Sequence, residues 1–457
     1  MRSRLISLIA LLLILPSIAL AKDTYPRLAN YYLSYFNRDK YAELAAWDLL
    51  VLQPDMIHYQ SAWFDYYRAH QREGKLLAYA YPASYYRPAV FYDYFGWRYR
   101  LFATINANNW WLRDAQGEVV ESWPNMSVVN LTNQAWQIFN LDYLDKTYGL
   151  EQNWDGIFYD LVDARASLYN QRGIDINNDG RADSAWQVDT QWQAAMTHWL
   201  EASRQRWPGK LIVINGNSLA DYQAPINGRM FENFPTPWEG AGTWADSMKQ
   251  YLAKLPALNQ APQTYLINAV YQPKDNRNFY AQMRFGLTSA LLGDGYFSFD
   301  NGESGHNTTW WFDEYNVKLG LSQGSAVNLL YPQTKTITAG VWRRDFANGI
   351  VLVNSTRQIH YLSLPDGEFK RLRGWQDPAI NTGQAIKELT LCPMSGIILL
   401  RQGTDQPVLT GTYLMSYDWA AARQPGSWWE EIRGQFKRFL VKLNLWFKYY
   451  YYGQHKN

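Results

Sequence analysis

Between residues 27 and 300 the chain alternates short apolar runs with amphipathic stretches. The apolar runs have the length of β-strands and fall at residues 27–35, 47–52, 75–82, 154–161, 210–216, 228–235, 264–271 and 293–300. Most lack the polar alternation of a half-exposed strand, which predicts that both faces are covered. Strands that alternate with helices predict a parallel sheet, and eight repeats are the number that closes an α/β barrel of the TIM (β/α)₈ type.

Residues 186–207 form a clear amphipathic stretch between two of these runs. Four apolar residues recur there at helical spacing, namely Trp192, Met196, Trp199 and Leu200. This spacing predicts a helix that packs one face on the sheet. The alternative fold is an open doubly wound sheet, which usually has fewer strands and often carries a Gly-rich phosphate-binding turn. The sequence contains no such turn, so the pattern favours the barrel.

After about residue 330 the pattern changes to short alternating strands, as in TKTITAGVWRRDFANGIVLVNS. The Asn348–Gly349 pair predicts a hairpin turn with positive φ. We therefore expect a small antiparallel β-sandwich domain after the barrel. Beyond it, residues 427–452 predict a basic, aromatic amphipathic helix. Such a helix either attaches to a membrane surface or a protein partner, or packs back on its own domain.

The N-terminus has the features of a secretory signal. Two arginines precede an apolar core and the small-residue triplet Ala19-Leu20-Ala21, which predicts cleavage before Lys22 and export to the periplasm or the extracellular space. An uncleaved membrane anchor is the alternative. The single cysteine, Cys392, excludes a disulfide within the chain. The predicted organisation is a signal peptide (1–21), a barrel domain (22–328), a β domain (329–403) and a tail (404–457).

Charge, composition and missing motifs disfavour several classes of ligand and enzyme. The net charge of +2 argues against a general polyanion binder, and the barrel region lacks a basic face for nucleic acid. Aromatic residues make up 16% of the chain, and many stand among polar residues, as in YAYPASYYRPAVFYDYFGWRY. Such rings suit either sugar contact or ordinary packing. No HExxH, G-x-S-x-G or P-loop motif is present, which disfavours zinc hydrolases, serine hydrolases and nucleotide enzymes.

The segment WDGIFYDLVD (154–163) is an apolar strand that ends in two acids, Asp160 and Asp163. In a parallel barrel the C-terminal strand ends converge on one mouth, where a carboxylate can be ionised. Apolar neighbours of Glu232 at the end of the sixth strand are expected to raise its pKa toward the range of a general acid. Asp160 is expected to stay anionic beside polar groups such as Arg165. Asp163 is expected to cap a helix or pair with an arginine.

Two carboxylates with separated pKa values across an aromatic-lined mouth are the equipment for glycosidic bond cleavage. We therefore expect a polysaccharide hydrolase that needs no cofactor for catalysis, with Glu232 as acid/base and Asp160 as nucleophile or base. The residues expected to contact substrate are Asp163, Asn215, Trp238, Asn268, Tyr271 and Asp300. Glu239 and Glu314 are alternatives for the second acid. The alternative function is a non-catalytic glycan-binding or polysaccharide-assembly protein attached through its tail helix.

The loop DINNDGRAD (175–183) has the spacing of a calcium loop. Its expected ligands are Asp175, Asn177, Asp179 and Asp183, with Gly180 at the tight sixth position. The glutamate expected at the twelfth position is missing, because Trp186 stands there. The loop therefore either holds a structural calcium ion or forms a hydrogen-bonded turn.

Several blocks of the sequence resemble the hypothetical glycosyl hydrolase barrels of bacteria and, more distantly, the endo-α-1,4-polygalactosaminidases of glycoside hydrolase family 114. The blocks are WDGIFYDLVD, FENFP, GLTSALLGDGYFSFD with WWFDEYNVKLG, and WRRDFANGIVLVN, spread over about residues 27–400. The resemblance implies a TIM-barrel glycoside hydrolase with Asp160 and Glu232 as its catalytic pair. The calcium-like loop and the basic tail depart from the family 114 pattern, so the resemblance leaves the substrate open.

Overall fold

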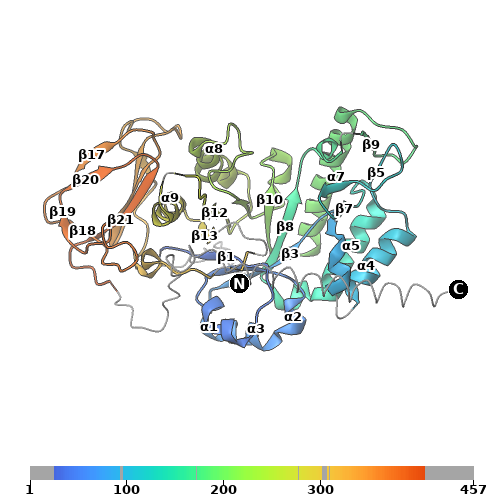
Figure 1. Ribbon diagram of the computed structural model, residues 1–457, viewed down its shortest axis with the longest axis horizontal. Helices are drawn as coiled ribbons and strands as arrows, with labels where there is room; N and C mark the ends of the chain where they lie inside the picture. Colours follow the sequence, from blue (N-terminus) through green and yellow to red (C-terminus); the bar gives the residue numbers. More distant parts are fainter. Residues whose placement is uncertain are drawn as a thin grey trace, which may run out of the picture.

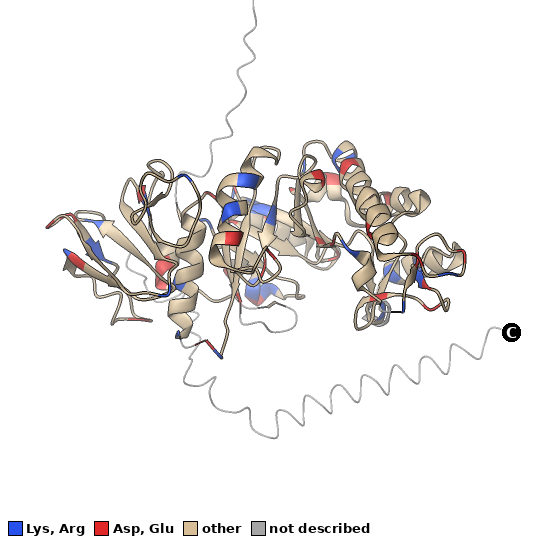
Figure 2. Cartoon of the chain, turned by 90° about the horizontal axis from the view of Figure 1, so that it is seen from above, with Lys and Arg blue, Asp and Glu red and all other residues tan. Residues whose placement is uncertain are grey.

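The computed structural model describes residues 25–406 except 93–95, 171, 276, 301–305 and 308. The predicted signal peptide and tail helix lie outside the described residues. Within them, no helix combines the length and apolar character that a membrane crossing requires. Cationic and anionic side chains are interspersed over the molecule, in keeping with a net charge of +2 (Figure 2).

Eight parallel strands form the centre of the molecule and follow one another around the sheet in chain order (Figure 1). They are β1 (Ala29–Tyr31), β2 (Leu49–Leu52), β3 (Lys75–Ala80), β8 (Gly156–Val162), β10 (Leu211–Gly216), β11 (Gly228–Phe231), β12 (Leu266–Val270) and β13 (Tyr296–Asp300). A parallel bridge between Leu28 and Phe297 joins the first strand to the last. The eight predicted strands and the barrel-like parallel sheet are therefore confirmed.

Alternate residues of these strands enter two different hydrophobic clusters. On β2, Leu49 and Val51 pack inside the barrel with Leu77 and Phe158, whereas Leu50 packs outside against the helices. Both faces of each strand are buried, which explains why the sequence shows apolar runs without polar alternation. The inward-facing register also decides which side chains reach the mouth.

Helices of unequal length cover the barrel. The longer ones are α3 (Ser61–His70), α5 (Gln134–Tyr148), α7 (Ala185–Arg206) and α9 (Phe279–Leu291), and α8 (Trp244–Lys249) continues into a π-helical turn. Side chains of Asn133, Ser184 and Asn278 accept backbone N–H bonds and cap α5, α7 and α9. The predicted helix at 186–207 is confirmed as α7. Between β10 and β11 the chain forms only a 3₁₀ turn, η4 (Ala220–Tyr222).

A long insertion after β3 builds a lobe beside the barrel, on the right of Figure 1. It contains β4 (Ser84–Tyr86), a 3₁₀ segment (Arg87–Tyr92), α4 (Trp97–Ala107), β5 (Arg113–Asp114), β6 (Glu121–Trp123) and β7 (Met126–Val128). After β8 the chain returns to this lobe, where β9 (Ile174–Asp175) pairs with β5.

The second part of the chain is antiparallel and lies on the left of Figure 1. Its six-stranded sheet has the order β14 (Val327–Asn328), β15 (Val341–Phe346), β16 (Gly349–Asn354), β21 (Ser395–Arg401), β18 (Phe369–Arg371) and β19 (Ala385–Ile386). A two-stranded ribbon of β17 (His360–Ser363) and β20 (Glu388–Leu391) shares a hydrophobic cluster with this sheet. The six-stranded sheet of the β domain therefore begins with β14 at Val327.

The predicted hairpin connects β15 and β16, but its geometry differs from the prediction. The turn residues are Ala347 and Asn348, and neither Asn348 nor Gly349 has a positive φ. The side chain of Asn348 donates to the carbonyl of Lys318, so the turn is held by the segment that leads into the β domain. Gly349 is required by close approach, because a Cβ there would lie 2.3 Å from the Leu399 carbonyl oxygen.

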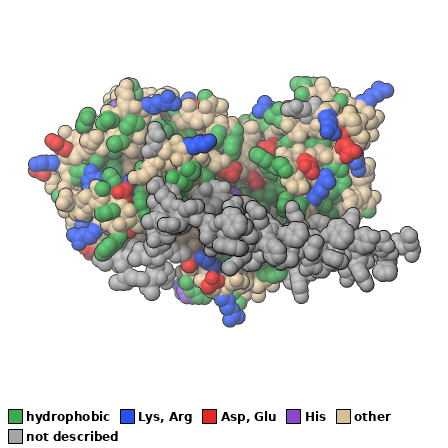
Figure 3. All heavy atoms as spheres, in the orientation of Figure 1, with side chains coloured by type: hydrophobic (Ala, Val, Ile, Leu, Met, Phe, Trp, Pro, Cys, Tyr) green, Lys and Arg blue, Asp and Glu red, His purple; other side chains and the backbone are tan. Residues whose placement is uncertain are grey.

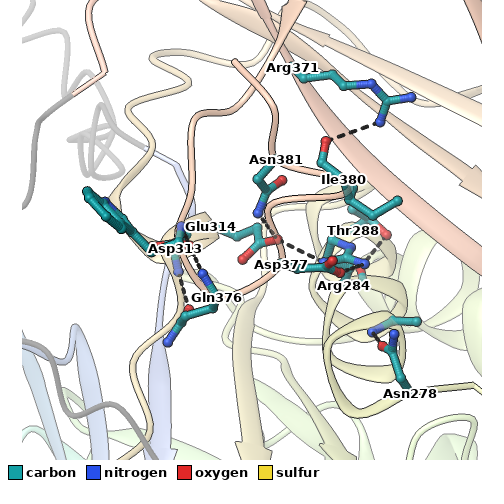
Figure 4. Close-up of polar contacts among 12 residues, drawn as sticks. Asn278, Arg284, Thr288, Asp313, Glu314, Arg371, Gln376, Asp377, Ile380 and Asn381 are labelled. Atoms are coloured by element: carbon teal, nitrogen blue, oxygen red, sulfur yellow. Dashed lines mark hydrogen bonds and ion pairs between the residues drawn. The ribbon is translucent and has the colours of Figure 1, made fainter. Parts of the chain in front are cut away.

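Helix α9 lies between the barrel and the β domain, and all its residues from Gln282 to Leu291 are buried. At its surface Arg284 forms ion pairs with Asp377 at 2.7 Å and with Glu314 at 3.3 Å (Figure 4). Asn381 of the β domain also donates to Glu314, at 2.9 Å. The two parts of the chain are therefore joined through a buried polar cluster.

Candidate active site

The C-terminal ends of the barrel strands place polar side chains in the inward-facing register. Asp160 follows Phe158 by two residues, Asn215 follows Val213, and Glu232 follows Met230, and the earlier residue of each pair lies in the barrel interior. Tyr31, Tyr79, Asn268 and Asp300 continue the same register on four further strands. Figure 3 shows a notch above β8 and β10 in which acidic side chains are visible.

Asp160 is held by neutral donors. Its Oδ2 accepts a hydrogen bond of 2.5 Å from the Tyr79 hydroxyl, and its Oδ1 accepts from the Leu161 backbone N–H at 2.8 Å. The Asn215 amide donates to Oδ1 at 3.0 Å. The expectation that Arg165 lies beside Asp160 is wrong, because Arg165 is exposed and the hydroxyl and amide donors occupy the carboxylate. Hydrogen bonds from neutral groups therefore stabilise this anion, together with the charge of His306.

Asn215 joins the two predicted catalytic acids. Its Nδ2 donates to Asp160 Oδ1 at 3.0 Å and to Glu232 Oε2 at 2.9 Å. Because one nitrogen contacts both oxygens, these oxygens are no more than about 6 Å apart. Strand β10 lies between β8 and β11, so a single residue on it can reach both acids.

Burial raises the pKa of both acids. For Asp160 the hydrogen bonds from Tyr79, Leu161 and Asn215, and the charge of His306, oppose this effect. For Glu232 only the Asn215 bond and the charge of His306 oppose it, and the nearby Asp160 and Asp300 raise its pKa further. The pKa of each acid is raised, but three hydrogen bonds favour the anionic form of Asp160 and only one favours that of Glu232.

His306 was missed by the sequence analysis. Its Nδ1 lies 3.1 Å from Asp300 Oδ2, and its ring packs on Tyr31 at 4.7 Å between centroids. Burial lowers the pKa of His306, but the hydrogen bond and charge of Asp300, with Glu232 and Asp160, outweigh burial and raise it. Since His306 lies in a loop after β13, no periodic signal marks it. The tyrosines could have been found, because they share the inward register of their strands.

The backbone is strained beside the acids. Leu161 and Asn233 directly follow Asp160 and Glu232 and have φ values of 56° and 53°, and His306 has φ 47°. Left-handed backbone is costly for a leucine and persists only where surrounding contacts impose it. Such strain is typical of sites where a side chain must be held in one direction.

The other predicted substrate residues have different surroundings. Asn268 is fully buried and donates to Asp300 at 3.3 Å, so it helps to fix the position of the Asp300 carboxylate. Asp163 accepts from the Tyr169 hydroxyl at 2.8 Å. Tyr271 packs edge-on against Phe279, and Trp238 is 49% exposed on the loop after β11.

Both alternative acids have arginine partners. Glu239 lies 2.8 Å from the fully buried Arg229. Glu314 lies 3.3 Å from Arg284 in the junction with the β domain. Each of these carboxylates is therefore neutralised by a structural cation, which leaves Glu232 as the acid beside Asp160.

The loop at 175–183 forms hydrogen-bonded turns. Asp175 accepts from the backbone N–H groups of Asp179 at 2.9 Å and Gly180 at 2.7 Å, and Asp183 accepts from Ile176 at 2.9 Å. Across the described residues, no group of three or more His, Cys, Asp or Glu is arranged to hold a metal ion. Asn177, the remaining predicted ligand, accepts from the same Asp179 N–H at 2.9 Å.

Comparisons with known proteins give one family match. The model of the family described as hypothetical glycosyl hydrolase family 15 matches residues 69–350. No curated protein matches the chain. Solved structures with some similarity include the glycoside hydrolase domain of PelA from Pseudomonas aeruginosa, with 14% identity over 62% of this chain and 97% of that chain and a TM-score of 0.40. The GH36 α-galactosidase AgaA from Geobacillus stearothermophilus has 10% identity, 83% and 56% coverage and a TM-score of 0.46. The α-amylase from Geobacillus thermoleovorans has 10% identity, 80% and 91% coverage and a TM-score of 0.44.

Proposed function

The chain belongs to hypothetical glycosyl hydrolase family 15, and we propose that it hydrolyses glycosidic bonds of a polysaccharide with Asp160 and Glu232 as its catalytic pair. One observation carries the proposal: the Asn215 amide donates to both carboxylates at the barrel mouth. Among the described residues, neither acid forms an ion pair with an arginine. One carboxyl group can therefore donate a proton to the substrate while the other attacks it.

The spacing supports a retaining mechanism. Carboxyl groups of retaining glycosidases are about 5–5.5 Å apart, and those of inverting enzymes about 6.5–9.5 Å. The limit of about 6 Å on the two oxygens held by Asn215 fits the retaining arrangement. In this mechanism Asp160 attacks the anomeric carbon while Glu232 protonates the leaving oxygen. Glu232 then deprotonates the water that displaces the sugar from Asp160.

The protonation states support these roles. The Tyr79, Leu161 and Asn215 donors stabilise Asp160 as the anion that a nucleophile must be. Burial and the charge of Asp160 favour a proton on Glu232 before the reaction begins. His306 and Asp300 lie across the mouth, where they can bind substrate hydroxyls.

The test begins with a glycan panel screened with the wild type and Asp160→Asn side by side. On a substrate found in this way, proton NMR of the first product should show the anomeric configuration of the substrate. Glu232→Ala should regain turnover of an activated aryl glycoside when azide is added, with a glycosyl azide of retained configuration as product. Inverted product would overturn the retaining assignment. A wild type that binds glycans but cleaves none would favour the non-catalytic binding function.

We also propose that the chain is exported and cut before Lys22. The motivation is the charged, apolar and small-residue order of residues 1–21. Mass spectrometry of the protein recovered from a cell envelope fraction should show Lys22 as the first residue. An intact N-terminus would instead support a membrane anchor. A chain ending at residue 406 tests the tail, because peripheral attachment through residues 427–452 predicts that only the full chain sediments with membranes.

A further inference from the structure

An aromatic pocket lies beside the catalytic pair, at the C-terminal ends of β2 and β3. Its volume is about 400 Å³, which is the liquid volume of about a dozen waters. Seven of its lining side chains are tyrosines, at positions 35, 79, 81, 85, 86, 143 and 148. Ligand sites are clefts of about 300–1,000 Å³ lined mainly by apolar and aromatic side chains, and this cleft lies in that range.

The insertion after β3 and helix α5 together build most of this pocket. Its floor consists of the buried side chains of Leu101 on α4 and Leu144 and Tyr148 near the end of α5. Its rim carries Tyr35 and Tyr86, which are 49% and 44% exposed. In Figure 1 these helices and β7 lie beside β3, so the barrel forms one wall and the inserted lobe forms the other.

Two hydroxyl groups link the walls of the pocket to Asp160 by hydrogen bonds. The Tyr79 hydroxyl lies 2.5 Å from Asp160 Oδ2 and 2.8 Å from the Tyr81 hydroxyl. An ionised carboxylate only accepts, so the single Tyr79 proton is donated to Asp160 and Tyr81 donates to Tyr79. Tyr79 and Tyr81 both line the pocket, and a ligand there lies next to the residues that hold Asp160.

The pocket carries no net charge. Arg98 is the only lining side chain of basic or acidic type among the described residues. Its guanidinium lies 2.9 Å from the buried Asp55, and both groups bond the Tyr35 hydroxyl. Burial raises the pKa of Tyr81 and keeps its hydroxyl neutral. The carboxylate of a uronic acid would have to displace Asp55 from Arg98, and the ammonium of an amino sugar would have to displace Arg98 from Asp55. A neutral ring needs no such exchange, because it can pack on tyrosine faces and bond their hydroxyls.

We propose that this pocket is a subsite for a neutral pyranose unit of the glycan, adjacent to the bond that is cleaved. The inference rests on the proposed function, because it takes the acid pair as the reaction centre. It adds that the enzyme prefers chains over single sugars and neutral units over charged ones at this position.

Two variants outside the catalytic machinery test the subsite. Ala89→Trp fills the pocket, and Tyr86→Ala removes an aromatic face from its rim. Tyr361→Ala is the matched control, since Tyr361 is 78% exposed on β17 in the β domain. Thermal melts and the rate on an aryl monosaccharide glycoside report whether each variant folds and keeps its reaction centre.

Binding is measured by calorimetry in a Glu232→Gln background, which prevents turnover. The probes are neutral hexose and N-acetylhexosamine oligosaccharides of several lengths, with oligogalacturonate and glucosamine oligomers as the anionic and cationic arms. We expect neutral oligomers to bind, and Ala89→Trp to raise their Kd at least about tenfold, with a smaller rise in Tyr86→Ala and none in Tyr361→Ala. Preference for either charged arm, no binding of any neutral oligomer, or equal Kd values in all variants would overturn the subsite.

The two proposals fail in different ways. If Ala89→Trp cleaves and binds long chains as the wild type does, the subsite is wrong while the acid pair stands. If Asp160→Asn keeps full activity, the acid pair is wrong whatever the pocket binds. A subsite predicts that Ala89→Trp loses kcat/KM on the polymer and keeps it on the aryl monosaccharide glycoside.

Discussion

Among the described residues, two buried clusters of acids differ in what surrounds their carboxylates. At the barrel mouth, Asp160 and Glu232 are bonded by an amide, tyrosine hydroxyls and a backbone N–H. At the junction with the β domain, Glu314 is bonded by Arg284 and Asn381 (Figure 4). Burial raises the pKa in both places. A raised pKa alone therefore does not identify a catalytic acid. The more informative feature is that no arginine or lysine of the described residues forms an ion pair with Asp160 or Glu232, whereas Glu314 has Arg284.

The largest expected effect comes from removing the charge of Asp160. Asp160→Asn should lower kcat on a responsive glycan by about 10⁴-fold or more, a scale seen when a nucleophile is removed. The melting temperature should change little, because no arginine or lysine of the described residues forms an ion pair with Asp160 and His306 keeps its partner Asp300. Asp377→Asn is the matched change in the other cluster and should leave kcat within about twofold while it lowers the melting temperature. Activity assays and thermal melts on both variants test this difference. Loss of stability without loss of activity in Asp160→Asn, or loss of activity without loss of stability in Asp377→Asn, would refute it.

Glu232→Gln should lower kcat on natural glycans by about 10²–10⁴-fold, the usual contribution of a general acid. Burial raises the pKa of Glu232, so wild-type activity should fall as pH rises through that raised value and the proton is lost. On a dinitrophenyl glycoside, whose leaving group needs no proton, this alkaline limb should disappear from the pH profile of the first step. An alkaline limb that persists in Glu232→Gln would assign the acid to another group.

Arg284→Met should destabilise the protein by about 3–5 kcal/mol, because it leaves Glu314 and Asp377 buried without their cation. Denaturant unfolding measures this loss. Below the unfolding transition kcat should be unchanged, since the cluster does not touch the mouth. A double variant, Arg284→Met with Glu314→Gln, should recover part of the stability, and equal losses in both variants would contradict the pairing.

A smaller effect of opposite sign is expected for the stability of Glu232→Gln. The pKa of Glu232 is raised in the folded state, so the folded protein binds this proton more tightly than the unfolded chain does. Stability is then lost as pH rises from the ordinary glutamate value through the raised one. The substitution removes this cost, so the melting temperature should rise at neutral pH, and this gain should shrink as pH falls through the raised pKa and vanish below the ordinary value of 4.5. A lower melting temperature at neutral pH would show that the carboxylate stabilises the fold.

The smallest effect concerns the loop at 175–183, where we propose a structural calcium ion. Added calcium should raise the melting temperature by a few degrees at most, through binding to the folded state alone. EGTA should reverse the rise, and Asp179→Asn should abolish it. If millimolar calcium does not change the melting temperature, the loop is a hydrogen-bonded turn that binds no calcium.

Apolar runs predicted the barrel because strands buried on both faces leave a strong local signal. Asp160, Asn215 and Glu232 were predicted because each stands at the end of an apolar strand, where parallel strand ends converge on one mouth. The structure adds that each follows an inward-facing apolar residue by two positions. The inserted lobe at 84–131 was not predicted, because its strands are short and paired with distant residues. His306 also escaped prediction, since only tertiary structure brings that loop to Asp300.

Helix α9 has a consequence for the order in which the protein is made. Its residues from Gln282 to Leu291 are covered on one side by the barrel and on the other by β16 and β21. A nascent chain that has emerged only as far as residue 328 would expose the apolar residues of α9 to water. The burial of α9 is therefore complete only when β16 and β21 are in place, so the barrel and the β domain depend on each other to cover this helix.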